Sequence, residues 1–385
     1  MKAPKLVGAL TLAVTAALTL GACGSSSTSS TKPPVGATGG GASSASGATS
    51  ASGATSGSGG GAGSPSCGSG TLNLAGSTAQ GPAISAFKKK YQTACSGSSI
   101  NDAAGGSGAG YTAFTGGTVD FAGSDYPLSD AQQPDANKRC GGTAIDIPLV
   151  PGGVAVIYNL SGVSDLKLTA QDLAMIFAGK ITKWDDPAIK KDNPSAPSTA
   201  IQTFHRSDGS GTSFNFSNYL SNVAKADWTY GANKVFPAPA SVGQGAMGSA
   251  GVAQGVKSTD GAIGYVDYSY AKPNSISFAQ VGRVDGSFAA LTSDAVSSFI
   301  APATVAGGSA NDLKLTFDYT QTTGYPIPLV TYEFVCQTGN KNASLLKGFL
   351  SYGAGSGQDL LPDLGYVKLP ASLQSKVTAS ISSLT

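Results

Sequence analysis

The chain has 385 residues, of which 24 are basic and 22 acidic, and it contains five cysteines and a single histidine. This balance leaves no basic face for a nucleic acid, so we expect no nucleic-acid partner. No histidine, cysteine or carboxylate residues stand at metal-ligand spacing, and no nucleotide-phosphate motif occurs, so we also expect no metal and no cofactor.

Residues 1–22 have the layout of a secretion signal. Lys2 and Lys5 precede an apolar run over residues 6–20, which is too short to span a bilayer. The run ends in LGAC, which resembles a bacterial lipobox with Cys23 as the lipidated residue. We therefore predict a lipoprotein that is anchored through Cys23 at the extracytoplasmic face of the cell membrane. The alternative is an ordinary secretion signal followed by a chance cysteine.

The segment after Cys23 predicts a tether. Residues 24–66 are almost entirely Gly, Ala, Ser and Thr, and Lys32 is their only charge. Such a segment cannot bury enough apolar surface to offset its ordering entropy. We therefore assign residues 23–67 to a lipidated, flexible tether with a root-mean-square span of about 35 Å. The remaining residues 68–385 carry 21 basic against 22 acidic residues and are long enough for two lobes.

Four cysteines follow Cys23, and an even number in an exported protein indicates two disulfides, with three pairings to choose from. We favour Cys67–Cys95 and Cys140–Cys336. The first pair flanks one strand–helix unit, which allows both cysteines to lie at the same edge of a parallel sheet. The second pair is what remains, and each of its members adjoins a β-rich segment.

Short β-rich runs alternate with helical patterns along the folded part. A strand over 71–77 precedes a helix with apolar residues at 84, 87, 91 and 94. The later units are strands within 100–104, 117–125 and 152–160, a helix over 169–180 with Thr169 and Asp172 in capping-box positions, and a strand–loop–helix over 199–225. This alternation predicts an α/β fold with two mixed, mainly parallel sheets.

Three strand-to-helix junctions share one pattern, in which glycine and hydroxyl residues follow the carboxyl end of a strand. They are residues 76–78, 105–108 and 206–212, and the last contains Arg206. In α/β proteins this is where ligands bind, and free N–H groups at a helix start favour an anion. One such junction is a weak signal, but three with an arginine predict an anion-binding site.

Asp120 and Asp125 follow the third strand, and a carboxylate facing an anion needs an explanation. Hydrogen phosphate can donate its proton to Asp125, whereas sulfate is fully ionised near pH 7 and would set lone pairs against the carboxylate. That mismatch costs at least about 1–3 kcal/mol. Asp125 would therefore select phosphate over sulfate. The alternatives are that Asp125 caps the following helix or pairs with a lysine.

Six segments carry a resemblance to a known family. They are AGST (75–78), GSGAG (106–110), VDFAGSDYPLS (119–129), GKITKWDDPAI (179–189), HRSDGSGTSFNF (205–216) and GAIGYVDYSYA (261–271). They resemble the PstS family, the phosphate-binding proteins of ABC phosphate importers. The resemblance covers essentially all of 68–385. It implies a type II periplasmic-binding-protein fold, with two α/β lobes joined by two crossing strands and the ligand between them.

By that resemblance, one lobe comprises 68–148 plus 326–385 and the other 149–325. The implied phosphate contacts, matched position by position, are Ser77, Thr78, Ala79, Ser107, Asp125, Arg206, Ser210, Gly211 and Thr212. Asp208 stands at the acidic position that holds the arginine. Family members often have an aromatic residue where this chain has Ala79, which preserves a backbone donor but changes the cover over the site.

The resemblance further implies a monomer that delivers phosphate to the permease subunits of the importer and performs no catalysis. The alternatives are a binding protein for another oxyanion, such as sulfate or molybdate, and a secreted phosphatase or hydrolase. The enzyme alternative is the weaker one. His205 is the only histidine, and Asp208, Ser210 and Ser213 lie within nine residues of it, whereas triad members usually come from separate loops.

Overall fold

The computed structural model describes residues 65–237, 239 and 241–385, which belong to one compact unit. The predicted signal peptide, the predicted lipidation site Cys23 and nearly all of the predicted tether lie outside these residues. Among the helices that the model describes, none combines the length and the apolar character needed to traverse a bilayer.

The first elements form a parallel sheet covered by helices. They are β1 (Gly70–Gly76), α1 (Gly81–Ala94), β2 (Ser98–Ala104), α2 (Ser107–Thr115), β3 (Phe121–Ser124) and α3 (Gln133–Cys140). β1 pairs in parallel with both β2 and β3, so the carboxyl ends of all three strands meet at one edge. α1 has a proline in its first turn and buries Ile84, Phe87 and Tyr91 on one face, as their spacing predicts.

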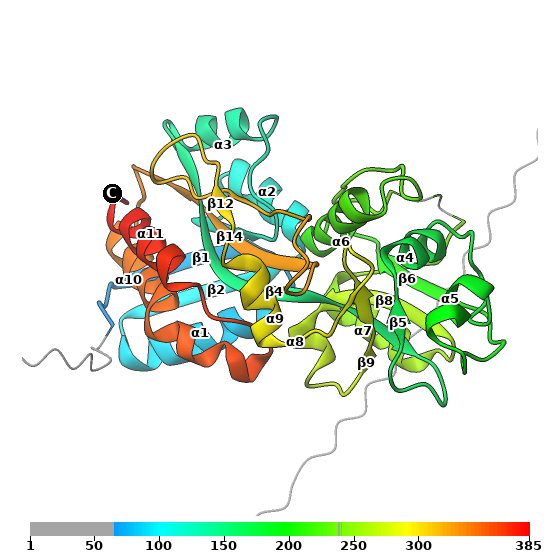
Figure 1. Ribbon diagram of the computed structural model, residues 1–385. Coiled ribbons are helices and arrows are strands. Elements are labelled where there is room, and N and C mark those ends of the chain that lie inside the picture. The colour runs from blue at the N-terminus through cyan, green and yellow to red at the C-terminus, as the bar shows by residue number, and fades with distance from the viewer. Residues whose placement is uncertain (1–64, 238, 240) are drawn as a thin grey trace, which may run out of the picture. The chain divides into compact units, whose positions relative to one another are not determined.

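β4 (Ala144–Asn159) is the long strand that joins the two halves of the fold (Figure 1). Its residues 144–153 pair antiparallel with β14 (Pro328–Cys336), and its residues 154–159 pair antiparallel with β8 (Ala262–Asp267). The backbone N–H of Val154 also donates to the carbonyl of Ile327 (2.9 Å). Two chain segments therefore cross side by side between the lobes, as predicted.

The second group of elements surrounds the far half of β4. It contains β5 (Lys167–Leu168), α4 (Ala170–Phe177), α5 (Pro187–Asp192), β6 (Gln202–Arg206), α6 (Gly211–Val223), β7 (Gln244–Ala246), α7 (Gly248–Ser258), β8, α8 (Tyr268–Ala271), β9 (Ser277–Phe278), β10 (Gln280–Gly282), β11 (Phe288–Ala289) and α9 (Ser293–Ile300). β6 is parallel to both β7 and β8. Thr169 and Asp172 form the predicted capping box at the start of α4. Because β4 belongs to both halves, the strands of the main sheet follow one hydrogen-bonded path, β2-β1-β3-β14-β4-β8-β6-β7, with β9 paired to β4 beside it. Two small sheets, β11-β10-β5 and β12-β13, lie apart from this path.

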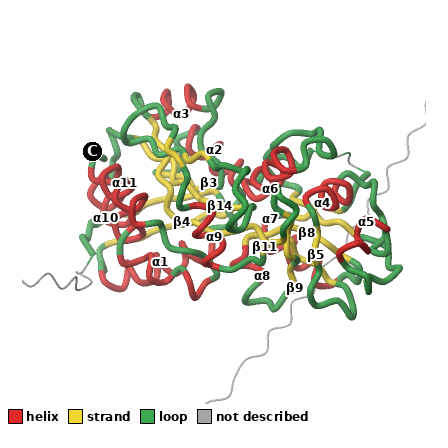
Figure 2. The backbone as a smooth tube through the Cα atoms, in the orientation of Figure 1, coloured by secondary structure: helices red, strands yellow, loops and turns green. Residues whose placement is uncertain are grey.

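The last elements return to the first lobe (Figure 2). They are β12 (Thr304–Val305), β13 (Leu315–Thr316), β14, α10 (Ala343–Ala354), two short 3-10 helices, η1 (Ser356–Leu360) and η2 (Pro362–Leu364), and α11 (Ala371–Ser382). α10 packs on α1, with the rings of Tyr91 and Phe349 edge to face at 5.6 Å. The mixed α/β, two-lobed architecture predicted from the sequence is confirmed.

Both predicted disulfides are present. Cys67 pairs with Cys95 and Cys140 with Cys336, each with 5.3 Å between the Cα atoms. The first ties the start of the folded part to the end of α1, and the second ties the end of α3 to the end of β14. The pairing favoured among the three alternatives is therefore confirmed.

Residues 311–315 contact the first lobe, although the sequence places them within the second. The N–H of Leu313 donates to the carbonyl of Asp146 (2.9 Å), and the N–H of Asp146 donates to Oδ1 of Asp312 (2.9 Å). The Nζ atom of Lys314 lies 3.6 Å from Oδ2 of Asp312 and 3.8 Å from Oδ2 of Asp146. The physical reason is that this loop supplies hydrogen bonds to the backbone of the buried Asp146, and Lys314 lies close enough to Asp146 and Asp312 to offset the repulsion between their carboxyl groups.

Candidate anion-binding site

The predicted strand-to-helix junctions of the two lobes meet in space. The N–H of Gly108 donates to the carbonyl of Gly209 (2.8 Å), and the N–H of Gly211 donates to the hydroxyl of Ser107 (3.1 Å). On the other side, the N–H of Ser249 donates to the hydroxyl of Thr78 (3.2 Å). Loops that lie more than a hundred residues apart in the sequence thus form one cluster.

Asp125 lies at the centre of this cluster, directly after β3. Its Oδ1 accepts hydrogen bonds from the hydroxyls of Ser77 (2.5 Å) and Thr331 (2.7 Å), and its Oδ2 lies 3.3 Å from the hydroxyl of Ser107. Burial raises the pKa of Asp125, and the three hydroxyls and the charge of Arg206 oppose that rise. A buried carboxylate is thus surrounded by neutral donors.

Arg206 is the last residue of β6 and is also buried. Its Nε donates to Oδ1 of Asp208 (2.7 Å) and its Nη2 to Oδ2, so the two side chains form a fork-to-fork pair. Burial alone would raise the pKa of Asp208, but the hydrogen bonds and charge of Arg206 outweigh it and hold that pKa below its usual value. The remaining nitrogen, Nη1, lies 3.5 Å from the hydroxyl of Thr212.

The start of α6 is packed directly against the Asp125 carboxylate. Ser210 is the N-cap, and its hydroxyl accepts from the N–H of Ser213 (3.2 Å). A Cβ at Gly211 would collide with the Asp125 side chain and lie 2.7 Å from the hydroxyl of Ser107. Only glycine therefore lets the helix N-terminus, with its positive dipole end, approach this closely.

The predicted residues at the end of β1 take different roles. The hydroxyl of Ser77 is committed to Asp125 and also accepts from the N–H of Ala79 (3.0 Å). The hydroxyl of Thr78 lies 3.1 Å from that of Ser249, and the carbonyl of Thr78 accepts from the hydroxyl of Tyr270 (2.8 Å). The structure therefore places Ser77 behind Asp125 and Thr78 at the contact with α7.

Four residues at the site were missed by sequence reasoning. They are Thr331 on β14, Asn215 on α6, and Gly248 and Ser249 at the start of α7. The N–H of Gly248 donates to Oδ1 of Asp208 (3.1 Å), and the side chain of Asn215 donates to the carbonyl of Asp125 (2.6 Å). Gly248-Ser249 repeats the glycine–hydroxyl pattern of the other junctions and could have been found. Thr331 stands in an apolar strand and carries no local signal.

His205 is engaged in an aromatic stack and a backbone contact. Its ring stacks on Phe236 with centroids 4.2 Å apart, and its Nδ1 lies 3.0 Å from the carbonyl of Arg206. The hydroxyl of Ser213 lies 2.8 Å from that of Tyr265, and that of Ser210 caps α6. The triad components considered in the sequence are thus each engaged elsewhere.

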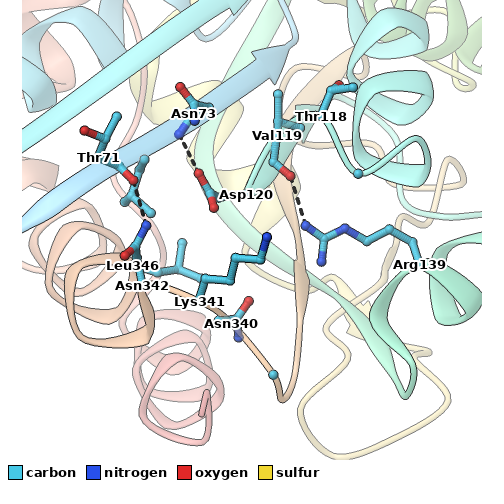
Figure 3. Close-up of a pocket in the computed structure, with 13 residues that line it drawn as sticks. Thr71, Asn73, Thr118, Val119, Asp120, Arg139, Asn340, Lys341, Asn342 and Leu346 are labelled. Carbon is cyan, nitrogen blue, oxygen red and sulfur yellow. Dashed lines mark hydrogen bonds between the residues drawn. The ribbon is translucent and has the colours of Figure 1, made fainter.

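A second polar pocket, of about 340 Å³, lies at the opposite, amino end of β1 (Figure 3). Asn73 donates its N–H to Asp120 (2.7 Å), Arg139 donates to the carbonyl of Val119 (3.0 Å), and Asn342 donates to the carbonyl of Thr71 (2.8 Å). Arg139 and Asn342 are each bonded to a backbone carbonyl, and the Asp120 carboxylate lines the same pocket. The candidate anion site therefore remains the cluster around Asp125.

Comparison with known proteins gives a consistent result. Residues 41–356 match the family model described as PBP superfamily domain. The chain is 39% identical over 326 residues to phosphate-binding protein PstS 3 of Mycobacterium tuberculosis, which covers 82% of this chain and 87% of that protein. It is 38% identical over 329 residues to phosphate-binding protein PstS 2 of the same organism, which covers 83% and 88%.

Solved structures of similar fold include two phosphate-binding proteins. The periplasmic protein PfluDING, bound with phosphate, has a TM-score of 0.65 at 22% identity, covering 80% of this chain and 93% of that one. The phosphate binding protein from Stenotrophomonas maltophilia has a TM-score of 0.66 at 21% identity, covering 81% and 94%. At these identities the likeness establishes the shared fold.

Proposed function

This chain belongs to the PstS family of phosphate-binding proteins, the substrate-binding components of ABC phosphate transporters, and we propose that it captures hydrogen phosphate at the cluster formed by Asp125, Arg206 and the start of α6. The observation that carries the assignment is the contact between a buried carboxylate and a helix N-terminus. Gly211 N–H donates to Ser107, whose hydroxyl lies 3.3 Å from Oδ2 of Asp125. An anion held there meets donors on one side and an acceptor on the other.

This mixture of donors and one acceptor suits an anion that carries a proton. Hydrogen phosphate satisfies the α6 N–H groups with its ionised oxygens and donates its proton to Asp125. A fully ionised sulfate would leave Asp125 facing lone pairs in a buried site, where unmatched charge is costly. Arg206 contributes a positively charged donor whose orientation is set by its pair with Asp208.

We propose a contact set that follows the sequence prediction, with one change of role. Ser77 acts on the anion through Asp125, because its hydroxyl is already donated to Oδ1. Asp208 acts through Arg206, which it orients. The proposed direct contacts are the hydroxyl or N–H groups of Thr78, Ala79, Ser107, Ser210, Gly211 and Thr212, together with the side chains of Asp125 and Arg206. In this proposal the N–H groups of Ala79 and Gly211, which donate to Ser77 and Ser107 in the structure, exchange these partners for the anion.

The lobe assignment, 68–148 with 326–385 against 149–325, stays a proposal, and the crossing of β4 beside Ile327 supports it. The exception is the segment from β12 to β13, which contacts the first lobe through Leu313 and Lys314. In this proposal the lobes close on the anion, and the closed form is what the permease subunits recognise. PfluDING is a periplasmic phosphate-binding protein, and we propose that this chain is likewise extracytoplasmic, a monomer held at the membrane by a lipid on Cys23. The cluster around Asp125 is assigned to binding and release without catalysis.

The test is calorimetric titration with phosphate at pH 7, on protein freed of bound anion by unfolding and refolding with its disulfides intact. We expect 1:1 binding that excess sulfate leaves unchanged. Asp125→Asn should weaken the binding of phosphate and allow sulfate to bind, because the amide offers an N–H donor in place of a charged acceptor. The matched control is Asp130→Asn, at an exposed position nearby, which should change neither the phosphate affinity nor the exclusion of sulfate. Equal binding of phosphate and sulfate by the unaltered protein would assign the site to another oxyanion.

A further inference from the structure

We infer that Thr331 is a positioning residue that determines anion specificity. Its hydroxyl donates to Oδ1 of Asp125 and orients the carboxylate so that Oδ2 accepts the proton of the bound anion. The inference rests on the proposed function, because it takes hydrogen phosphate as the anion that Asp125 meets. Thr331 lies in the chain far from the phosphate motifs, and it acts on the anion only through Asp125.

The register of the sheet brings Thr331 to Asp125. β14 lies between β3 and β4, and Tyr332 pairs with Ser124, the last residue of β3. Thr331 is therefore opposite the position just past the end of β3, which Asp125 occupies. On its other side, β14 shifts register against β4 between Thr331 and Tyr332. The Thr331 side chain is completely buried, and its hydroxyl lies 2.7 Å from Oδ1 of Asp125.

The two oxygens of the Asp125 carboxylate are in different surroundings. Oδ1 accepts two short hydrogen bonds, from Ser77 (2.5 Å) and Thr331 (2.7 Å), which use both of its lone pairs. Oδ2 has only the longer contact with Ser107 (3.3 Å). A Cβ built on Gly211 would lie 2.8 Å from Oδ2, so this oxygen faces the start of α6, where we place the anion.

Two donors on Oδ1 have a chemical consequence for the whole carboxyl group. They favour the ionised form, which only accepts hydrogen bonds, and they stop the group from rotating Oδ1 towards the anion. Without Thr331, the protonated form becomes easier to populate in this buried position. A protonated Asp125 would donate a hydrogen bond at this position and could no longer accept the proton of hydrogen phosphate. Phosphate binding would then weaken, and a fully ionised anion would no longer be excluded.

The experiment compares Thr331→Val, which keeps the branched shape and removes the donor, with Thr331→Ser, which keeps the donor. Phosphate and sulfate affinities are measured by calorimetry from pH 6 to 8.5 on the anion-free protein. The other ionisable groups around Asp125 are unchanged in both variants; they are Tyr126, Arg206, Asp267, Tyr270 and Glu333. Thermal unfolding verifies that each variant is folded, and Thr331→Ala replaces the valine variant if that one does not fold.

We expect Thr331→Val to weaken phosphate binding about tenfold at pH 7, more at pH 6 and less at pH 8.5. Sulfate should compete measurably with phosphate at pH 6 in this variant, while Thr331→Ser should behave as the unaltered protein. A merely structural role would weaken binding equally at every pH and leave sulfate excluded. That result, or a serine variant no better than the valine variant, would overturn the inference.

A second measurement separates this inference from the proposed function. Titration of the Asp125 carboxyl carbon by NMR, in anion-free protein, should show a higher pKa in Thr331→Val and not in Thr331→Ser. If the unaltered protein bound no phosphate, the proposed function would fail, while the carboxyl titration would still report whether Thr331 controls Asp125. If phosphate bound and the titration were unchanged, the inference alone would fail.

Discussion

The side-chain amide of Asn215 donates a 2.6 Å hydrogen bond to the backbone carbonyl of Asp125 and a second, of 2.9 Å, to the carbonyl of Gly211. Asn215 belongs to α6 and Asp125 to the end of β3, so one side chain joins the proposed anion donors of one lobe to the proposed acceptor of the other. The contact holds the lobes in the arrangement that brings Asp125 and Gly211 together.

Asn215→Ala should therefore weaken phosphate binding by about tenfold, because the buried carbonyl of Asp125 loses its donor and closure loses a contact. The matched control is Asn222→Ala on the same helix, whose side chain is exposed and bonds only to Asn218. Calorimetry at pH 7 measures both. Unchanged affinity in the first variant would show that Asn215 plays no part in closure.

Arg206→Lys should lower phosphate affinity by about 10- to 100-fold although the charge is kept. An ammonium group cannot make the fork-to-fork pair with Asp208 and also present a nitrogen near Thr212, where Arg206 Nη1 now lies at 3.5 Å. Arg283→Lys, at the position directly after β10, serves as the control for the substitution itself. A lysine variant with full affinity would mean that positive charge alone is sufficient.

Gly211→Ala tests the close approach of α6 to Asp125. The added methyl would collide with the Asp125 side chain, so we expect the phosphate affinity to fall by more than tenfold while the protein stays folded. The control is Gly308→Ala, since a Cβ there meets no atom within 4 Å. Binding is measured by calorimetry and folding by circular dichroism. Tight binding by the alanine variant would contradict the packing described here.

Glu333, the only glutamate of the chain, should make the protein less stable as the pH rises. It is fully buried on β14, and neither of its carboxylate oxygens has a hydrogen-bond partner among the described residues. Burial, with added repulsion from Asp102 and Asp125, raises the pKa of Glu333 to about 8. The folded state therefore binds this proton more tightly than the unfolded chain, in which the ordinary value of 4.5 applies.

The stability that Glu333 contributes is present below about pH 4.5 and is lost as the pH rises to about 8. Glu333→Gln should remove that loss and raise the free energy of unfolding at pH 9 by a few kcal/mol relative to the unaltered protein. Denaturant unfolding between pH 5 and 9 measures it, with the exposed Asp359→Asn as control. Parallel stability curves for the unaltered and glutamine proteins would disprove the assignment.

Much of the fold was readable from the sequence because it is encoded in local patterns. The spacing of Ile84, Phe87 and Tyr91 predicts α1, and Thr169 with Asp172 predicts the start of α4, since a helix is stabilised by contacts between residues a few positions apart. The glycine–hydroxyl junctions also lie within single short segments. They predict donors at strand ends, and the structure brings Ser107 and Gly211 within hydrogen-bonding distance.

The remaining features depend on which residues become neighbours across the sheet and between the lobes. Thr331 meets Asp125 because Tyr332 pairs with Ser124, and that register is set by packing along the whole length of β14. Asn215 and the carbonyl of Asp125 meet only when the lobes come together, and Leu313 reaches Asp146 through a loop that leaves its own lobe. Contacts of this kind have no periodicity and no fixed spacing along the chain, so they are determined by the tertiary fold and are not visible in any single segment.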